Sequence, residues 1–183
     1  VSEPDSGIFN AMNKGVALTL GRYVNFMNAG DVFAEDSVLR EVVPILDGDE
    51  FDIVYGDFEE AFPGDRTRYR RATDVKEIVF GGPTRHQSIF YRRGLLDDAP
   101  YDESMKIAAD WCHLFDAIHG GASTLHLPRA IARFDMSGTS QRQWKLGLSE
   151  RVQHLKCAGV WTPEVIRRYR FIILHMLIAK SLE

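Results

Sequence analysis

The opening of the chain is the feature that most restricts its fold. Residues 2–15 read SEPDSGIFNAMNKG, and the motif NAGD at 28–31 ends an apolar run thirteen residues later. Apolar residues at three- and four-residue steps predict a helix over 8–20, and the β-rich run at 23–27 predicts a strand. A helix followed directly by a strand is typical of a parallel α/β sheet. An acidic Gly-containing loop and a carboxylate at a strand's carboxyl end also suit a metal-bridged diphosphate.

The rest of the chain continues the alternation of helices and strands. The spacing predicts helices at 36–46, 104–118, 148–158 and 163–182, strands at 51–57, 84–91 and 123–127, and a Gly-Ser loop at 136–140. The last strand can resume after Pro128 as far as Phe134. The arginine-rich stretch 66–71 is expected to form a hairpin or surface loop. We therefore expect one α/β domain over 1–183, with a mostly parallel sheet flanked by helices and a helical C-terminal extension at 141–183.

The position of the first loop indicates that strands are missing upstream. A nucleotide-binding α/β sheet normally begins with its first strand and phosphate-contacting turn before such a loop. We expect that the chain either lacks these strands or is completed by another chain.

Composition excludes several classes of protein. The net charge is -4 and the isoelectric point is near 5.9, so general nucleic-acid binding is not expected. Cys112 and Cys157 have no CxxC spacing, which fits a reducing compartment better than a disulfide framework or a zinc site. Neither a secretory signal nor an apolar run of about 18 residues is present, so the cytoplasm is the expected location.

Five segments, in this order and spacing, carry a resemblance to a known family. They are SEPDSGIFNAMNKG, FMNAGDVF, TRHQSIFYRR, YDESMKIAADW and FDMSGTS. Together they resemble the family-two inverting glycosyltransferases, above all bacterial enzymes of capsule, exopolysaccharide and lipopolysaccharide assembly. The resemblance implies a nucleotide-diphospho-sugar transferase-like sheet, a nucleoside diphosphate sugar donor bound through Mg or Mn, and a carboxylate base that activates an acceptor hydroxyl. This chain would be the carboxyl two thirds of such a domain.

Asp31 is the residue expected to hold the metal. The resemblance places the second acid of the family's metal motif at Asp31, whereas the preceding acid is replaced by Gly30 and the first polar position is Asn28. Both Asn28 and Asp31 are therefore assigned to nucleotide-sugar binding. The alternative is that NAGD is an ordinary turn, because these residue types favour turns on their own.

Asp110 is the residue expected to act as general base. An inverting displacement needs one carboxylate opposite the leaving diphosphate, and the family base corresponds to this Asp. The alternative is a solvated acid on the helix face or a local partner for Lys106, four residues earlier. Asp102 and Glu103 also compete, but they are more simply explained as acids at the start of the same helix.

Three further residues are assigned to nucleotide-sugar binding. Asp5 and Asn13 match the family pattern in the opening loop, although capping of the first helix explains an Asp there equally well. His86 would bind a phosphate oxygen or the metal as a neutral imidazole, but a lone His beside apolar residues is more often only hydrogen bonded.

Two basic segments are relevant to binding partners of the chain. The arginines at 66–71 follow several acids, which favours a solvated loop over an RNA site. At 167–174 a basic edge precedes an apolar helix, and such a helix can lie on an anionic leaflet at the inner membrane face, as a lipid-linked acceptor would require. Core packing or a homodimer contact explains the same residues at least as well.

The sequence thus predicts a sugar-transferring enzyme that acts on a nucleotide sugar and a glycan or lipid-linked acceptor. The alternative function is a non-catalytic or partner-completed binding module that retains the fold. A phosphohydrolase using Asp31 ranks last, because the sequence supplies no lysine and second acid for a nucleophilic Asp.

Overall fold

The computed structural model describes residues 2–64, 66–136 and 142–181. Its centre is one six-stranded sheet with the strand order β1-β5-β3-β6-β2, to which β4 is added through β3. The strands are β1 Tyr23–Val24, β2 Val32–Phe33, β3 Ile53–Phe62, β4 Arg66–Arg70, β5 Ile89–Arg92 and β6 Thr124–Asp135. The helices are α1 Ile8–Leu18, α2 Val38–Asp47, α3 Arg93–Asp98, α4 Ala109–His119, α6 Trp144–Cys157 and α7 Pro163–Ser181, with short 3-10 helices η1 Val75–Phe80 and η2 His86–Ser88.

The sheet is mixed, which corrects the expectation of a mostly parallel one. Only the long central pair β3 and β6 is parallel, whereas β1, β2, β4 and β5 all pair antiparallel to a neighbour. The expected α/β architecture with flanking helices and C-terminal helices is confirmed. The antiparallel strands are shorter than the two strands of the parallel pair, and β4 follows β3 directly in the chain as the second strand of a hairpin.

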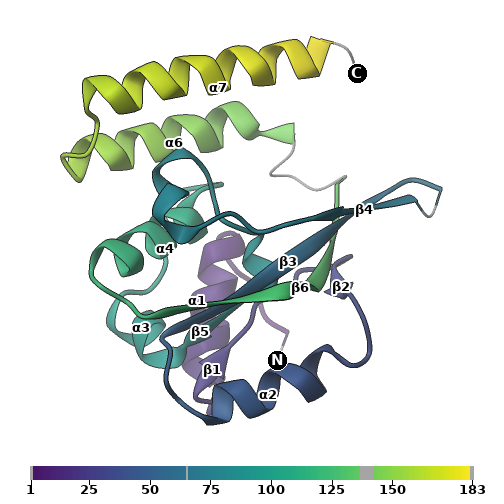
Figure 1. Cartoon of the computed structure of the whole chain (residues 1–183). Coiled ribbons are helices and arrows are strands. Elements are labelled where there is room, and N and C mark those ends of the chain that lie inside the picture. The colour runs from purple at the N-terminus through teal and green to yellow at the C-terminus, as the bar shows by residue number, and fades with distance from the viewer. Residues whose placement is uncertain (1, 65, 137–141, 182–183) are drawn as a thin grey trace.

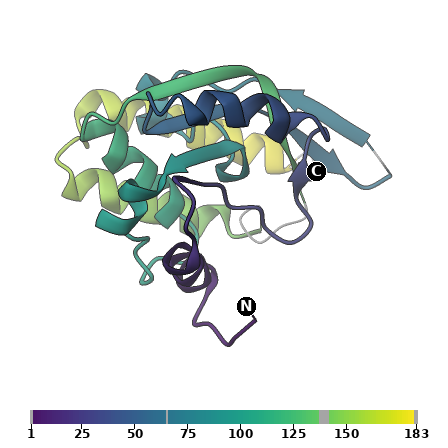
Figure 2. The same cartoon turned by 90° about the horizontal axis from the view of Figure 1, so that it is seen from below.

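Helices cover both faces of the sheet. On one face α2 packs Val38, Val42 and Leu46 against Val54, Phe90 and Ile131. On the other face a larger core joins α1, α4 and η1 to the C-terminal helices, which contribute Leu155, Val165 and Tyr169. Figure 1 shows α6 and α7 stacked above the sheet, and the view from below shows α1 and α2 on opposite sides of it (Figure 2).

Most of the predicted elements are present with shifted ends. The strand expected at 23–27 ends at Val24, because the side chain of Asn25 takes over the pairing by donating to the carbonyls of Gln87 and Ile89. The stretch at 66–71 forms a true strand that pairs with β3 as a hairpin. From residue 137 on, the expected Gly-Ser loop lies outside the described residues, as does the expected helix end at Leu182.

The helix expected at 104–118 begins later, at Ala109. The backbone amides of Lys106, Ile107 and Ala108 all donate to the carboxylate of Glu150 on α6, at 2.8–3.0 Å. This carboxylate from a distant helix satisfies amides just before α4, and Asp110 consequently lies in the first turn of α4 rather than in its middle. A helix N-terminus favours negative charge, so this position stabilises an ionised Asp110.

A buried carboxylate on β3 ties the β4 hairpin and the strand β6 to the sheet. Asp57 is 2% exposed and accepts from the amide of Ala72 at 2.8 Å, from Nε2 of His126 at 2.9 Å and from the hydroxyl of Tyr69. Burial alone would raise the pKa of Asp57, but these donors outweigh it and lower the pKa below its ordinary 3.8. The hydrogen bond from the Tyr69 hydroxyl to Asp57 raises the pKa of Tyr69 to about 12.

Replacing Asp57 with Asn should therefore cost stability in a pH-dependent way. Near pH 7 we expect a loss of about 2 kcal/mol in the free energy of unfolding, because bonds to a charged acceptor are replaced by weaker ones. A depressed folded pKa contributes stability above the ordinary value of 3.8, and this contribution disappears as the pH falls through the folded pKa. Urea unfolding should show the difference between the two proteins shrinking towards acid, whereas Asp47→Asn, an exposed acid paired with Arg22, should change little at any pH. A constant difference across the range would contradict this assignment.

Candidate functional site

His86 is the centre of the candidate site. It lies in η2, where the amide of Ser88 donates to the carbonyl of Arg85 at 2.8 Å and turns the chain before β5 begins. Its Nδ1 lies 3.0 Å from Oδ2 of Asp110 on α4, and its Nε2 lies 2.9 Å from the amide nitrogen of Asn28. Since the amide nitrogen can only donate, Nε2 accepts and Nδ1–H donates to Asp110. The ring is thus a neutral imidazole that bridges two other predicted site residues.

Asp110 is held as an ionised carboxylate. Its Oδ1 accepts from the amide of Trp111 at 2.7 Å, its Oδ2 accepts from His86, and its side chain is 23% exposed. Desolvation would raise the pKa of Asp110, but the hydrogen bond from His86, the nearby Arg151 guanidinium and the Trp111 amide outweigh it and lower the pKa. Asp110 pairs with His86 rather than with Lys106.

Asp31 lies beside this bridge. The motif at 28–31 is a turn in which the amide of Asp31 donates to the carbonyl of Asn28 at 3.0 Å. Gly30 has a φ of 94°, a left-handed conformation that favours glycine. The carboxylate of Asp31 accepts from the side chain of Gln87, the residue after His86, and from the amide of Asp135 at 2.8 Å. The NAGD segment is therefore a turn, and it also brings a carboxylate to the site.

The structure thus brings together four of the predicted site residues, Asn28, Asp31, His86 and Asp110. Asp5 and Asn13 are held elsewhere. Asp5 accepts from the amide of Gly7 at 3.0 Å, within the opening loop, while Gly7 rather than Asp5 is the N-cap of α1. The side chain of Asn13 donates from Nδ2 to the carbonyl of Tyr101 and accepts at Oδ1 from the backbone amide of Tyr101, each at 2.9 Å. These two contacts tie α1 to the segment before α4, and the nucleotide role of Asp5 and Asn13 stays a prediction.

Several residues of the site were not found from the sequence. Gln87 is fully buried and links Asp31 to the His86 turn, and Asp135 lies next to Gly30, where its Oδ2 is 3.5 Å from the place that a Cβ on Gly30 would take. Glu150 positions the start of α4, and the guanidinium of Arg151 lies 5.3 Å from the ring centre of Trp111. Gln87 could have been found from its place next to His86 in the sequence. Asp135, Glu150 and Arg151 come from chain segments too distant for sequence spacing to indicate.

A metal would have to share its coordination with a substrate. Among the described residues, no group of three or more His, Cys, Asp and Glu side chains is placed to hold an ion. The carboxylate of Asp31 accepts from the amide of Asp135, and the carboxylate of Asp135 lies beside Gly30, which fits a Mg or Mn ion that takes its remaining ligands from diphosphate oxygens and water.

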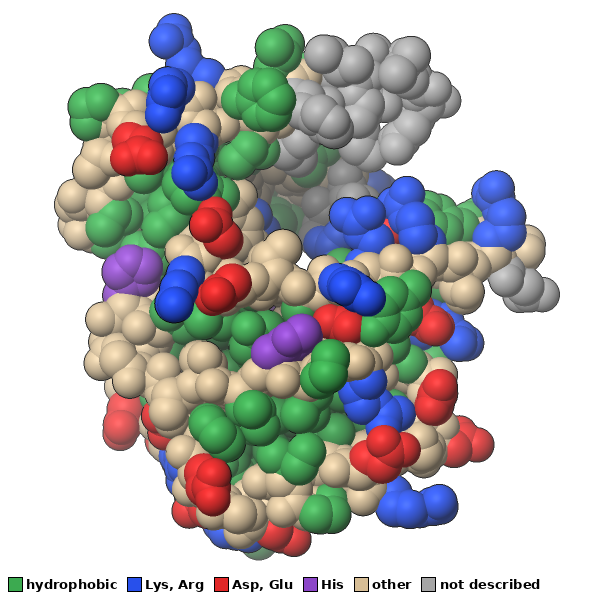
Figure 3. Space-filling model, in the orientation of Figure 1, with side chains coloured by type: hydrophobic (Ala, Val, Ile, Leu, Met, Phe, Trp, Pro, Cys, Tyr) green, Lys and Arg blue, Asp and Glu red, His purple; other side chains and the backbone are tan. Residues whose placement is uncertain are grey.

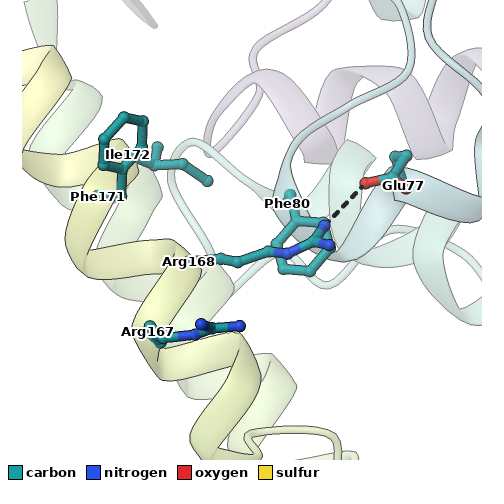
Figure 4. Close-up of a pocket in the computed structure, with 6 residues that line it drawn as sticks. All are labelled: Glu77, Phe80, Arg167, Arg168, Phe171 and Ile172. Carbon is teal, nitrogen blue, oxygen red and sulfur yellow. Dashed lines mark hydrogen bonds and ion pairs between the residues drawn. The ribbon is translucent and has the colours of Figure 1, made fainter.

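A separate groove lies between α7 and η1. Its volume is about 440 Å³, and it is lined by Glu77, Phe80, Arg167, Arg168, Phe171 and Ile172. Figure 4 shows Arg168 crossing the groove over the ring of Phe80, 4.5 Å from its centre, to reach Glu77 at 3.4 Å. Phe171 is 71% exposed, so this end of α7 presents apolar surface to solvent. Among the described residues, no helix combines the length and the apolar character that crossing a membrane requires.

The fold and parts of the sequence match known proteins. The structure resembles S. aureus TarS 1-349 with a TM-score of 0.57 at 17% identity, covering 82% of this chain and 45% of that one. The same protein in complex with UDP-GlcNAc gives a TM-score of 0.59 at 16% identity, over 85% and 48%. At such low identity these matches show the fold alone.

Sequence relatives are closer. A PGL/p-HBAD biosynthesis glycosyltransferase of Mycobacterium bovis and one of Mycobacterium tuberculosis are each 34% identical over 111 residues, which is 60% of this chain and 43% of the relative. The chain thus spans less than half the length of these curated relatives. Residues 2–99, more than half of the chain, match the family described as Glycosyl transferase family 2. The chain belongs to glycosyl transferase family 2.

Proposed function

We propose that this chain carries the catalytic centre of an inverting glycosyltransferase. In this proposal a sugar moves from a nucleoside diphosphate donor to a glycan or lipid-linked acceptor in cell-surface polysaccharide synthesis. The observation that carries the proposal is the bridge from Asn28 through His86 to Asp110, with Asp31 attached through Gln87. Family membership and the UDP-GlcNAc complex of the structurally similar TarS support the donor class.

Asp110 would accept the proton of the acceptor hydroxyl. Its lowered pKa keeps it ionised, and each carboxylate oxygen retains a lone pair beyond the bonds from His86 and the Trp111 amide. His86 would fix the direction of the carboxylate by donating from Nδ1, while Asn28 holds the tautomer by donating to Nε2. A base held in one orientation lowers the entropy cost of reaching the transition state.

Asp31 and Asp135 would receive the donor diphosphate through a divalent ion. When bound, Mg or Mn would neutralise the negative charge that grows on the leaving diphosphate. The amide of Asp135 and the side chain of Gln87 fix the Asp31 carboxylate in place. The left-handed φ of Gly30 and the nearby Asp135 carboxylate fit the replacement of the family's first acid, since a carboxylate is still supplied at that corner.

Replacing Asp31 with Ala should weaken metal-dependent nucleotide binding. Calorimetric titration of UDP and other nucleoside diphosphates with Mn should show heat for the wild-type chain, with affinity at least about tenfold weaker in the variant. Asp47→Ala, an exposed acid outside the site, is the control. Equal binding by Asp31→Ala would remove Asp31 from the donor site. Lack of heat with every nucleotide would instead favour a non-catalytic or partner-completed binding module.

The groove at α7 fits the lipid-linked class of acceptor. On α7, the cationic Arg167 and Arg170 are followed by the exposed apolar residues Phe171 and Leu174. This combination favours peripheral contact with an anionic membrane at its cytoplasmic face. The same apolar surface would serve a homodimer.

A further inference from the structure

The β3–β4 hairpin carries a row of arginines on one face. Side chains directly opposite each other in an antiparallel pair lie on the same face, and Arg66, Arg68 and Arg70 stand opposite Phe62, Glu60 and Phe58. We name these three arginines, together with Arg85, the arginine face. Figure 3 shows Lys and Arg side chains gathered along this hairpin and beside the hollow below the C-terminal helices.

Among the described residues, three of the four arginines of this face contact one acid, Glu60. The carboxylate of Glu60 is 5% exposed and meets Arg68 at 2.7 Å through Nε, and both Arg70 and Arg85 at 3.9 Å. One negative charge therefore offsets several positive ones, and the face keeps a cationic surplus. On the opposite face of β3, Glu59 pairs with Arg133 of β6 at 2.8 Å.

Aromatic rings hold part of the arginine face in place. The guanidinium of Arg85 lies 4.8 Å from the ring centre of Phe134 and 5.5 Å from that of Phe58, and Arg68 lies 5.4 Å from that of Phe62. A stacked guanidinium keeps its fork of donors pointing in a fixed direction, which favours bidentate binding of phosphate or carboxylate. The face is thus better ordered than a set of free surface arginines.

The arginine face leads directly to the candidate base. Arg85 is the residue before His86, whose ring binds Asp110, and it is the N-cap of η2. Arg151 lies over Trp111, the residue after Asp110. Cationic side chains therefore lie beside both members of the His86–Asp110 pair and continue along β4, where alternate residues are about 6.7 Å apart.

We propose that the arginine face binds the acceptor, and that this acceptor is an anionic glycan bearing phosphate or carboxylate groups. This inference rests on the proposed function. The donor diphosphate would be received at the Asp31–Asp135 corner, whose carboxylates need a divalent ion to bind an anion, whereas the arginines supply positive charge of their own. The row of arginines runs away from the base along a strand, so it suits a polymer with repeated negative charges. A single diphosphate would not occupy the whole row.

The test compares two double variants with the same change in charge. Arg66→Ser with Arg70→Ser removes two arginines but leaves Arg68 on buried Glu60, so that folding is preserved. The control, Arg22→Ser with Arg133→Ser, removes two exposed arginines outside the face. The probes are polygalacturonate as an anionic glycan, neutral dextran, and single-stranded poly(U), with binding followed at several salt concentrations.

We expect the wild-type chain to bind polygalacturonate and not dextran. The hairpin variant should lose at least about tenfold in affinity and show a shallower salt dependence, since it contacts fewer anionic groups, whereas the control should stay within about twofold. Equal losses in both variants, binding of dextran as tight as that of polygalacturonate, or tighter binding of poly(U) would overturn the proposal. UDP and Mn calorimetry on the hairpin variant should be unchanged. Polyanion binding by a chain that binds no nucleotide would contradict the donor assignment and leave the arginine face standing.

Discussion

Asp110→Asn should lower the turnover of a nucleotide sugar by about a thousandfold, because the amide cannot take the proton of the acceptor hydroxyl. The amide keeps the shape of the carboxylate, and its one oxygen can still accept either from His86 or from the backbone of Trp111, so the fold and donor affinity should be retained. Turnover is measured as release of the nucleoside diphosphate from a panel of nucleotide sugars, and donor affinity by calorimetry. The combination of lost turnover and retained binding is what a general base requires.

The matched control is Asp116→Asn on the same helix. Asp116 is 60% exposed and pairs with His154 at 2.8 Å, so its loss should leave turnover within about twofold. Because the pKa of Asp110 is lowered, the wild-type rate should stay constant down to a pH below the ordinary carboxyl range before it falls. Turnover by Asp110→Asn equal to that of the control would move the base to another residue.

Gly56→Ala should destabilise the fold by about 3 kcal/mol, through overpacking at the only parallel strand pair described. A Cβ on Gly56 would overlap the side chain of buried Ile131 and come within 2.9 Å of the carbonyl oxygen of Arg129. Both are part of β6, and the register of β3 and β6 shifts directly after Gly56. The backbone of Arg129 cannot move without disturbing this irregular pairing, so the clash has no easy relief.

Gly15→Ala supplies the comparison, because a Cβ there meets nothing within 4 Å and Gly15 lies inside α1. That change should raise stability by up to about 1 kcal/mol through helix propensity. Chemical denaturation of the three proteins gives both values. A Gly56→Ala protein as stable as the wild type would mean that β3 and β6 pair less closely than described.

Local patterns predicted the elements well where the local signal was strong. The helices around Val42 and Leu155 and the buried strand at Ile53 follow apolar periodicity, and packing preserved them. The sheet's mixed character was not predictable in this way, because strands such as β1 and β2 have two residues each and acquire their direction from the neighbour they meet. Apolar periodicity predicts that a helix or strand exists more reliably than it predicts which strand it pairs with.

In the candidate site, too, the sequence indicated individual residues but not their partners. Resemblance indicated Asn28, Asp31, His86 and Asp110 as separate residues, and the fold joined them through bonds between residues up to 58 positions apart. The start of α4 was misplaced because Glu150 takes the amides that would otherwise have continued the helix upstream. The arginines at 66–71 were expected to be solvated, since charge alternation in the sequence does not reveal that Arg68 and its neighbours share one face with a single acid.

The hydrogen bonds from three successive backbone amides to Glu150 have a consequence for the redesign of this fold. The carboxylate that fixes the segment before the proposed base Asp110 is encoded some forty residues downstream, on a helix that also places Arg151 over Trp111, the residue after Asp110. Chimeras that exchange α6 between relatives would therefore shift the proton acceptor along with the surface they were meant to alter. Specificity in this scaffold is best transplanted as a unit that keeps residues 106–110 together with their own α6.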